Sequence, residues 1–236
     1  MKKKVAVLVS VAAAVCCGYL SFAVAAPKAA AAAHPSKKSQ ATVYVAGHGG
    51  HFAKADVTID PANDDAPLKV NGLDMVNIGT TESHKTHDAR IDQKDRGLMF
   101  WSTYALDKEG KLHVGKSNLK TGKVIQDVAF LPDERAPMKA GPAYCASGQS
   151  KSAFLPVFMG SEGYIDVWDK KTLVRRHRVF VSDLGYKAGT YQFVHGSNSH
   201  DMKRFLVTLT LKGEDGKMTG KQDLVPGSVH HLKLEA

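Results

Sequence analysis

Histidines stand at three places in this chain where their spacing could build a metal or haem site. His84 and His87 are separated by two residues, and His195 opens a similar stretch much later in the chain. His48 and His51 lie in a Gly-rich segment, Gly-His-Gly-Gly-His. Neutral imidazole is a good ligand for copper, zinc and haem iron, and imidazoles from separate loops can complete one coordination shell. These five histidines are therefore candidate metal ligands.

The elements that must position these histidines are predicted to be β-strands. Runs of β-branched and aromatic residues alternate with turn residues, and no stretch keeps a helical hydrophobic period over three turns. Aligning Leu98, Phe154 and Phe205 gives a repeat of roughly 50 residues, which is typical of propeller blades. The predicted strands are Thr42–Val45, Leu98–Trp101, Phe154–Phe158, Tyr164–Trp168, Leu173–Val181 and Phe205–Leu211.

Two segments carry a resemblance to a known family. The sequence Ile-Asp-Val-Trp-Asp-Lys-Lys-Thr-Leu at 165–173 and the sequence Leu-Lys-Thr-Gly-Lys-Val at 119–124 resemble the β-propeller repeats of the YVTN and cytochrome d1-type family. The resemblance implies an all-β propeller of four-stranded blades over residues 42–236, with about four blades. The first copy, from Thr42 to Gly79, is expected to supply only the last three strands of its blade.

The propeller interpretation places the candidate histidines on one face of the disc. His84 and His87 fall in a connection between blades, His48 and His51 fall between strands of the first blade, and His195 falls at the start of an inner strand. His87 and His195 are expected at equivalent positions nearest the central channel. The matching point of the middle blade is near Tyr144 and Cys145.

The resemblance also suggests which cofactor the histidines would bind. In the wider family, nitrite reductases of the cytochrome d1 type seat haem over this face, and nitrous oxide reductases hold a copper cluster with propeller histidines. We therefore expect copper or non-covalent haem, bound through His87 and His195, in a redox or electron-transfer context. The alternative is that the histidines only hydrogen-bond to neighbouring backbone and connect the blades.

Several other residues could take part in chemistry, but we expect most of them to have structural roles. Cys145 is expected to be a buried apolar filler, with metal ligation as the alternative. Asp88 could orient the His87 ring or simply belong to a turn. His200 is assigned to a turn on the opposite face. The remaining histidines of the predicted body are expected to be structural residues on strands or strand edges, namely His113, His177, His230 and His231.

The N-terminal segment has the features of an export signal. Lys2, Lys3 and Lys4 precede a long apolar run, and Ala-Val-Ala at 23–25 offers the small residues that signal peptidase requires. We expect residues 1–25 to be removed, residues 26–41 to form a flexible tether, and the mature protein to be periplasmic or extracellular with no membrane span. The alternative is an uncleaved anchor, since about 20 apolar residues can span a bilayer.

Charge and motifs exclude several classes of function. The formal net charge is +9, but the lysines alternate with acidic residues along the chain, and the only compact basic cluster, residues 175–178, reads as a strand. Nucleic-acid binding needs a basic stripe with stacking aromatic residues, which the sequence lacks. The sequence contains no G-x-S-x-G elbow, H-E-x-x-H helix or C-x-x-C-H haem attachment, so any haem would be non-covalent.

The predicted number of strands leaves the ring of blades open. An unusual closure, a partner or further blades of a longer protein could complete the ring, and an open sheet edge is an aggregation hazard in a monomer. We therefore consider two kinds of partner, an exported redox protein and a second copy of the chain that completes the ring. The alternative function is a periplasmic scaffold that binds protein or carbohydrate without a cofactor.

Overall fold

The computed structural model describes residues 37–137 and 144–224. The predicted signal at 1–25 and most of the predicted tether lie outside the described residues, as do His230 and His231. Within the described part, no helix is long and apolar enough to cross a membrane.

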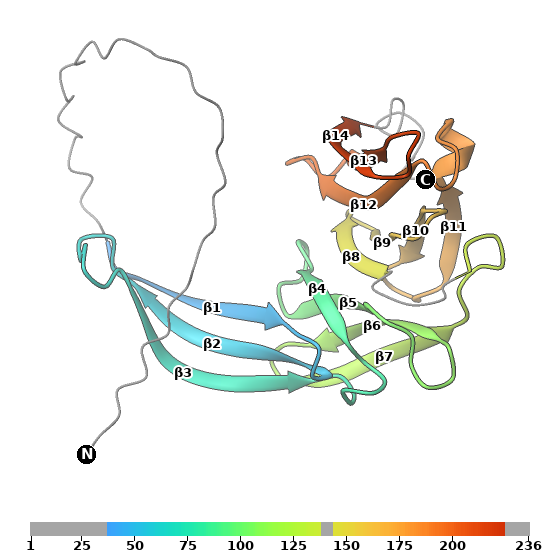
Figure 1. Cartoon of the computed structure of the whole chain (residues 1–236). Coiled ribbons are helices and arrows are strands. Elements are labelled where there is room, and N and C mark those ends of the chain that lie inside the picture. The colour runs from blue at the N-terminus through green and yellow to red at the C-terminus, as the bar shows by residue number, and fades with distance from the viewer. Residues whose placement is uncertain (1–36, 138–143, 225–236) are drawn as a thin grey trace, which may run out of the picture. The chain divides into compact units, whose positions relative to one another are not determined.

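The described chain is all-β and forms four antiparallel sheets in succession (Figure 1). The first sheet contains β1 (Ser39–Ala46), β2 (His51–Ile59) and β3 (Leu68–Asn77). The second contains β4 (Thr86–Ile91), β5 (Leu98–Thr103), β6 (Leu112–Asn118) and β7 (Lys123–Phe130). The third contains β8 (Tyr144–Gln149), β9 (Ala153–Phe158), β10 (Tyr164–Asp169) and β11 (Arg175–Phe180). The fourth contains β12 (Tyr191–Asn198), β13 (Phe205–Lys212) and β14 (Met218–Leu224), after a short 3-10 helix at Val181–Leu184.

The predicted fold class is confirmed. In each sheet, strands adjacent in the sequence are paired antiparallel, which is the meander of a propeller blade. The first sheet has three strands, as the repeat predicted, and the second and third have four. The strand boundaries differ from the predicted ones by up to three residues, as at β1, which begins at Ser39 rather than at residue 42. Two histidines are also displaced: His87 lies on β4 rather than in the connection before it, and His195 lies in the middle of β12 rather than at its start.

One apolar core lies between each pair of consecutive sheets. Strand β9 shows how the sequence produces this arrangement, because Phe154 and Phe158 pack toward the second sheet whereas Leu155 and Val157 pack toward the fourth. Successive side chains of a strand point to opposite faces, so a strand packed on both faces favours apolar residues at successive positions. All six residues of β9 are buried.

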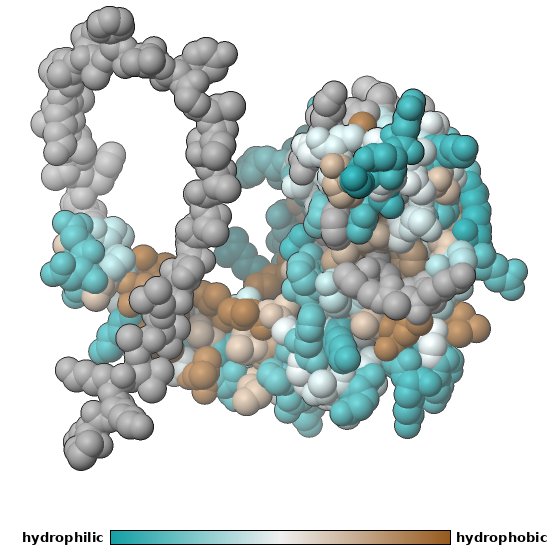
Figure 2. Space-filling view, in the orientation of Figure 1, coloured by the Kyte–Doolittle hydropathy of each residue, from teal (hydrophilic) through white to brown (hydrophobic). Residues whose placement is uncertain are grey.

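The first sheet differs because one of its faces is apolar and exposed. We call this the outer apolar face. The strand register places on it Ala41, Val43 and Val45 of β1, Ala53, Ala55 and Ile59 of β2, and Leu68, Val70, Leu73 and Met75 of β3. Val57 of β2 lies on the same side but is buried. Leu73 is 76% exposed and Met75 is 58% exposed. Figure 2 shows hydrophobic surface over this sheet.

Candidate functional site

Two loops of the first sheet bring four of the candidate histidines into one region. The β1–β2 loop carries His48, and His51 begins β2. The connection from β3 to β4 carries His84 and leads to His87. Backbone hydrogen bonds join the two loops: the amides of residues 78 and 79 donate to the carbonyl of residue 50, and the amide of residue 86 donates to that of residue 47. Glycine is required at position 50, because its φ is +74° and a Cβ there would lie 2.6 Å from the residue 80 backbone.

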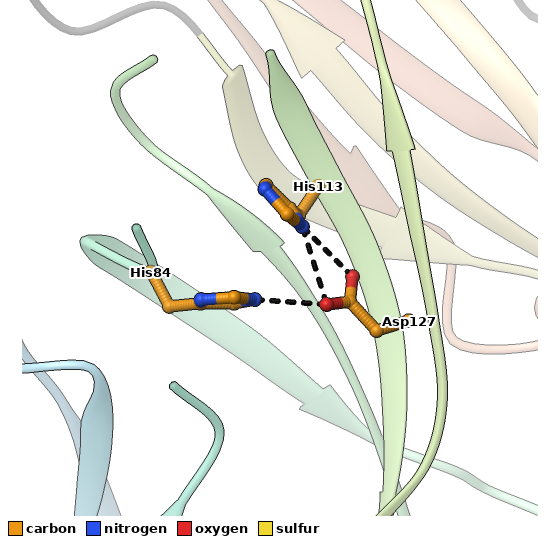
Figure 3. A group of neighbouring side chains, drawn as sticks. All are labelled: His84, His113 and Asp127. Carbon is orange, nitrogen blue, oxygen red and sulfur yellow. Dashed lines mark hydrogen bonds and ion pairs between the residues drawn. The ribbon is translucent and has the colours of Figure 1, made fainter. Parts of the chain in front are cut away.

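The tightest cluster of possible metal ligands joins His84, His113 and Asp127 (Figure 3). Nε2 of His84 lies 2.9 Å from Oδ2 of Asp127, and Nδ1 of His113 lies 3.0 Å from Oδ1. The two imidazole centroids are 4.4 Å apart. Both histidines are buried whereas Asp127 is exposed, so the cluster can be reached from the carboxylate side.

The second nitrogen of each imidazole in this cluster also has a partner. Nδ1 of His84 lies 2.7 Å from Oγ of Ser83, and Nε2 of His113 lies 3.2 Å from Oδ2 of Asp107. Such partners fix the orientation and tautomer of an imidazole, and metal-ligating histidines almost always have them. The cluster therefore has the outer contacts that a metal site requires.

The charges in the cluster stabilise one another. Burial, the largest single influence, raises the pKa of Asp127, but the hydrogen bonds from His113 and His84 outweigh it and lower the pKa to about 2. Burial lowers the pKa of His113, but the hydrogen bonds to Asp127 and Asp107 outweigh it and raise the pKa above the ordinary value. Asp127 is thus a carboxylate near neutral pH, ready to share a cation with the histidines.

The strands explain how the three side chains meet. His113 is on β6 and Asp127 is on β7, where Gly115 is the residue directly opposite Asp127. His113 and Asp127 are therefore diagonal neighbours on one face, at a separation that long side chains can bridge. The ring of Trp101 packs edge-on against His84, with 5.6 Å between ring centroids, and closes the apolar side of the cluster.

A second group of possible ligands surrounds His87. Nδ1 of His87 lies 4.0 Å from Sγ of Cys145, and Sδ of Met159 lies 3.8 Å from the same sulfur. Potential ligand atoms of His87, Asp88 and Cys145 all lie within 4.8 Å of one another. Burial, followed by the negative charge of Asp88, raises the pKa of the Cys145 thiol to about 12.

Aromatic stacking positions the His87 ring. Tyr104 stacks on His87 with 5.1 Å between centroids and on His48 with 5.2 Å between centroids. Burial, followed by the nearby Cys145, raises the pKa of the Tyr104 phenol. This phenol is therefore neutral near neutral pH and acts as a flat apolar support between two imidazoles.

A pocket of about 370 Å³ opens beside His87. Its walls come from β1, β2, β4 and β5, and His87 and Asp88 supply polar groups to an otherwise largely apolar lining that includes Tyr44, Phe52 and Met99. Apolar pockets with a few converging polar groups are the usual form of small-ligand sites. The pocket gives the His87 group an approach from the first sheet.

The remaining predicted ligands belong to neither group of three. His51 bonds to the Gly49 carbonyl through Nδ1 at 3.1 Å, which matches the structural alternative for this residue. His195 is exposed, and its role as a ligand stays a prediction. Conversely, sequence analysis missed Asp127 and assigned His113 a structural role. Both residues stand in strands that carry several other polar residues, so their sequence context did not mark them.

Comparisons with known proteins show little at the sequence level. No family model and no curated protein matches the sequence. A chain of the solved mitotic checkpoint complex is 7% identical, with a TM-score of 0.41 over 87% of this chain and 60% of that chain. A chain of hydrazine synthase from Kuenenia stuttgartiensis is 9% identical, with a TM-score of 0.30 over 72% of this chain and 56% of that chain. This chain thus spans less than two thirds of each of these two solved chains.

Proposed function

We propose that this chain is an exported metal-binding protein of the propeller type, which holds a divalent ion between His84, His113 and Asp127. The proposal rests on the arrangement of this cluster: three possible ligand atoms converge, and the second nitrogen of each imidazole has a hydrogen-bond partner. Ser83 and Asp107 hold both rings in the orientation that directs a nitrogen of each toward Asp127, as partners of metal-ligating histidines do. Export rests on the N-terminal sequence, and it supplies the setting for the metal site.

The distances require only a small change on metal binding. Ligand atoms that share one ion at the usual metal–nitrogen and metal–oxygen distances lie about 3.4 Å apart in tetrahedral geometry. The nitrogen–oxygen distances in the cluster are 2.9 Å and 3.0 Å, which are hydrogen-bond lengths. An ion would displace the protons in those bonds and separate the atoms by a few tenths of an ångström, so binding releases protons.

The donor set indicates which metals fit. Two imidazoles and one carboxylate suit zinc, and the same set with open positions suits iron(II), which would place the protein in a redox context. Copper also accepts imidazole donors and belongs in the same test. The set favours an ion over haem, because Asp127 oxygens lie 2.9 Å and 3.0 Å from the imidazole nitrogens, and a porphyrin plane does not fit into that space.

Elemental analysis tests this proposal directly. The chain is expressed with its own N-terminal segment, purified without affinity metal, stripped with chelator and refilled separately with zinc, iron(II) or copper(II). We expect close to one ion per chain, and we expect H84A and D127A each to lose it. The matched control H200A, at an exposed turn position, should load like the unchanged chain. Equal loading of D127A and H200A would refute the proposal.

The outer apolar face favours a second candidate function, a scaffold that docks another exported protein. Contiguous exposed apolar surface commonly marks interaction sites. Chemical crosslinking in the producing cell would test this alternative. Recovery of one defined partner, lost when Leu73 becomes lysine, together with failure of any metal to load, would favour the scaffold over the metal-binding function.

A further inference from the structure

The His87 group has a donor set unlike that of the His84 cluster. It combines a thiol from Cys145, a thioether from Met159 and an imidazole from His87, with the carboxylate of Asp88 close by. Sulfur ligands favour copper(I) and zinc, and the thioether, a soft uncharged donor, favours copper(I) of the two. The geometry points to a second metal site, in which Cys145, Met159 and His87 bind a copper(I) ion. This site is independent of the one proposed above.

The spacing of the donor atoms around Cys145 is compatible with a shared ion. Ligand atoms on one metal, at about 2.3 Å for sulfur and about 2.0 Å for nitrogen, lie roughly 3.5–4.0 Å apart in tetrahedral or trigonal geometry. The two distances from Sγ of Cys145 are 3.8 Å to Met159 and 4.0 Å to His87. Each of these two pairs could therefore share an ion with little change in its separation.

Burial strengthens the preference for a soft, singly charged ion. Cys145 is 3% exposed and Met159 is half-buried, whereas His87 is exposed and borders the 370 Å³ pocket. An ion can enter past His87 and reach sulfur ligands away from water. When the thiol binds Cu⁺, its proton leaves to solvent, so the Cys145–copper unit is neutral and burying it costs less than burying a dication.

The fold holds these donors in place through matched strand positions. The turns after β4 and β8 are closed by the amides of Asp92 and Ser150. His87 and Cys145 both stand five residues before those amides, and the pairing is irregular at both places: the irregularity in β4 contains His87, and the one in β8 directly follows Cys145. Because β4 and β8 contact each other, equivalent positions of neighbouring sheets meet, while Met159 follows β9 and reaches the same sulfur.

A competition titration tests the copper(I) site. Reduced, metal-free protein is titrated anaerobically with Cu⁺ in the presence of bicinchoninate, a coloured Cu⁺ chelator. We expect one Cu⁺ per chain to be withdrawn from the chelator, and X-ray absorption should show sulfur neighbours at about 2.3 Å. C145S should abolish this binding. M159L should weaken it at least roughly tenfold, the lower range for changes around a metal site.

Matched variants separate this site from the His84 cluster and from unfolding. H84A should leave Cu⁺ binding unchanged, and M75L, which changes an exposed methionine of the first sheet, should do the same. Circular dichroism shows whether C145S remains folded. If C145S unfolds, the comparison of Cu⁺ binding by M159L with Cu⁺ binding by M75L tests the site instead. Cu⁺ binding that survives both C145S and M159L overturns the assignment. Coordination by nitrogen and oxygen alone, or tighter retention of Zn²⁺ than of Cu⁺, overturns it as well.

Discussion

At the scale of single residues, His113 has the most unusual environment of the described histidines. Both of its ring nitrogens face carboxylates, Asp127 at 3.0 Å and Asp107 at 3.2 Å. A carboxylate can only accept a hydrogen bond, so both nitrogens must carry a proton in this arrangement. His113 is therefore an imidazolium when no metal is bound, in agreement with its raised pKa.

This charge state predicts how the stability of metal-free protein depends on pH. Because the folded-state pKa of His113 is raised, the stability from its charged form is fully present below the ordinary histidine pKa of about 6.5 and is lost as pH rises through the raised value. D127N removes the closer carboxylate and should lower the free energy of unfolding by about 1–3 kcal/mol. Thermal unfolding of both proteins between pH 5 and pH 9 should show the difference in Tm shrinking at the alkaline end. If the Tm of the two proteins differs by the same amount at every pH, a stabilising imidazolium at His113 is contradicted.

The same residues show how much of the site could be predicted from sequence. His84 and His87 were recognisable because two closely spaced histidines near a predicted connection between blades suggest chemistry, although His87 lies on β4 itself. Asp127 and the role of His113 were not, since a diagonal pair on β6 and β7 depends on the strand register. Register is set by pairing across the sheet, and no single strand sequence contains it. The contact of Met159 with Cys145 also depends on pairing, here between β8 and β9.

At the scale of elements, the connection from β3 to β4 determines where His84 lies. The amide of Gly79 donates to the Gly50 carbonyl, and a Cβ at position 79 would lie 2.0 Å from Nδ1 of His84. The missing side chain therefore leaves the space that the imidazole occupies. The sequence repeat predicted a histidine-bearing loop here. It did not predict that the His84 ring would lie so close to the Gly79 backbone, because that contact forms only in the folded chain.

We therefore expect G79A to impair the His84 cluster. The added methyl group must push the imidazole away from Asp127, and overpacking of this kind costs about 1–3 kcal/mol. The variant should lose the divalent ion and unfold at a lower temperature. G47A is the matched control in the adjoining loop, because a Cβ there meets no atom within 4 Å. Equal metal content in G79A and G47A would show that the backbone at position 79 does not position His84.

At the scale of the described unit, the first sheet exposes more large apolar side chains to solvent than any other sheet. The cores between successive sheets bury apolar side chains on both faces of the second and third sheets. The first sheet contributes one face to such a core and exposes the other, which carries a cross-strand row of Val43, Ala55 and Leu73. The repeat predicted an open ring, and the strand register shows that the exposed apolar surface gathers on one face.

The outer apolar face should make the protein associate, whether with itself or with a partner. Leu73 is 76% exposed and Val43 is 42% exposed, so lysine at both positions needs no rearrangement of a core. The double variant V43K/L73K should bind less of an apolar fluorescent dye and sediment as a smaller species than the unchanged chain at high concentration. Its free energy of unfolding should change by no more than about 0.5 kcal/mol, as is usual for surface changes. V174K is the control, because Val174 is 61% exposed but lies outside the face. If V174K reduces dye binding and association as strongly as V43K/L73K, net charge rather than the outer apolar face governs association.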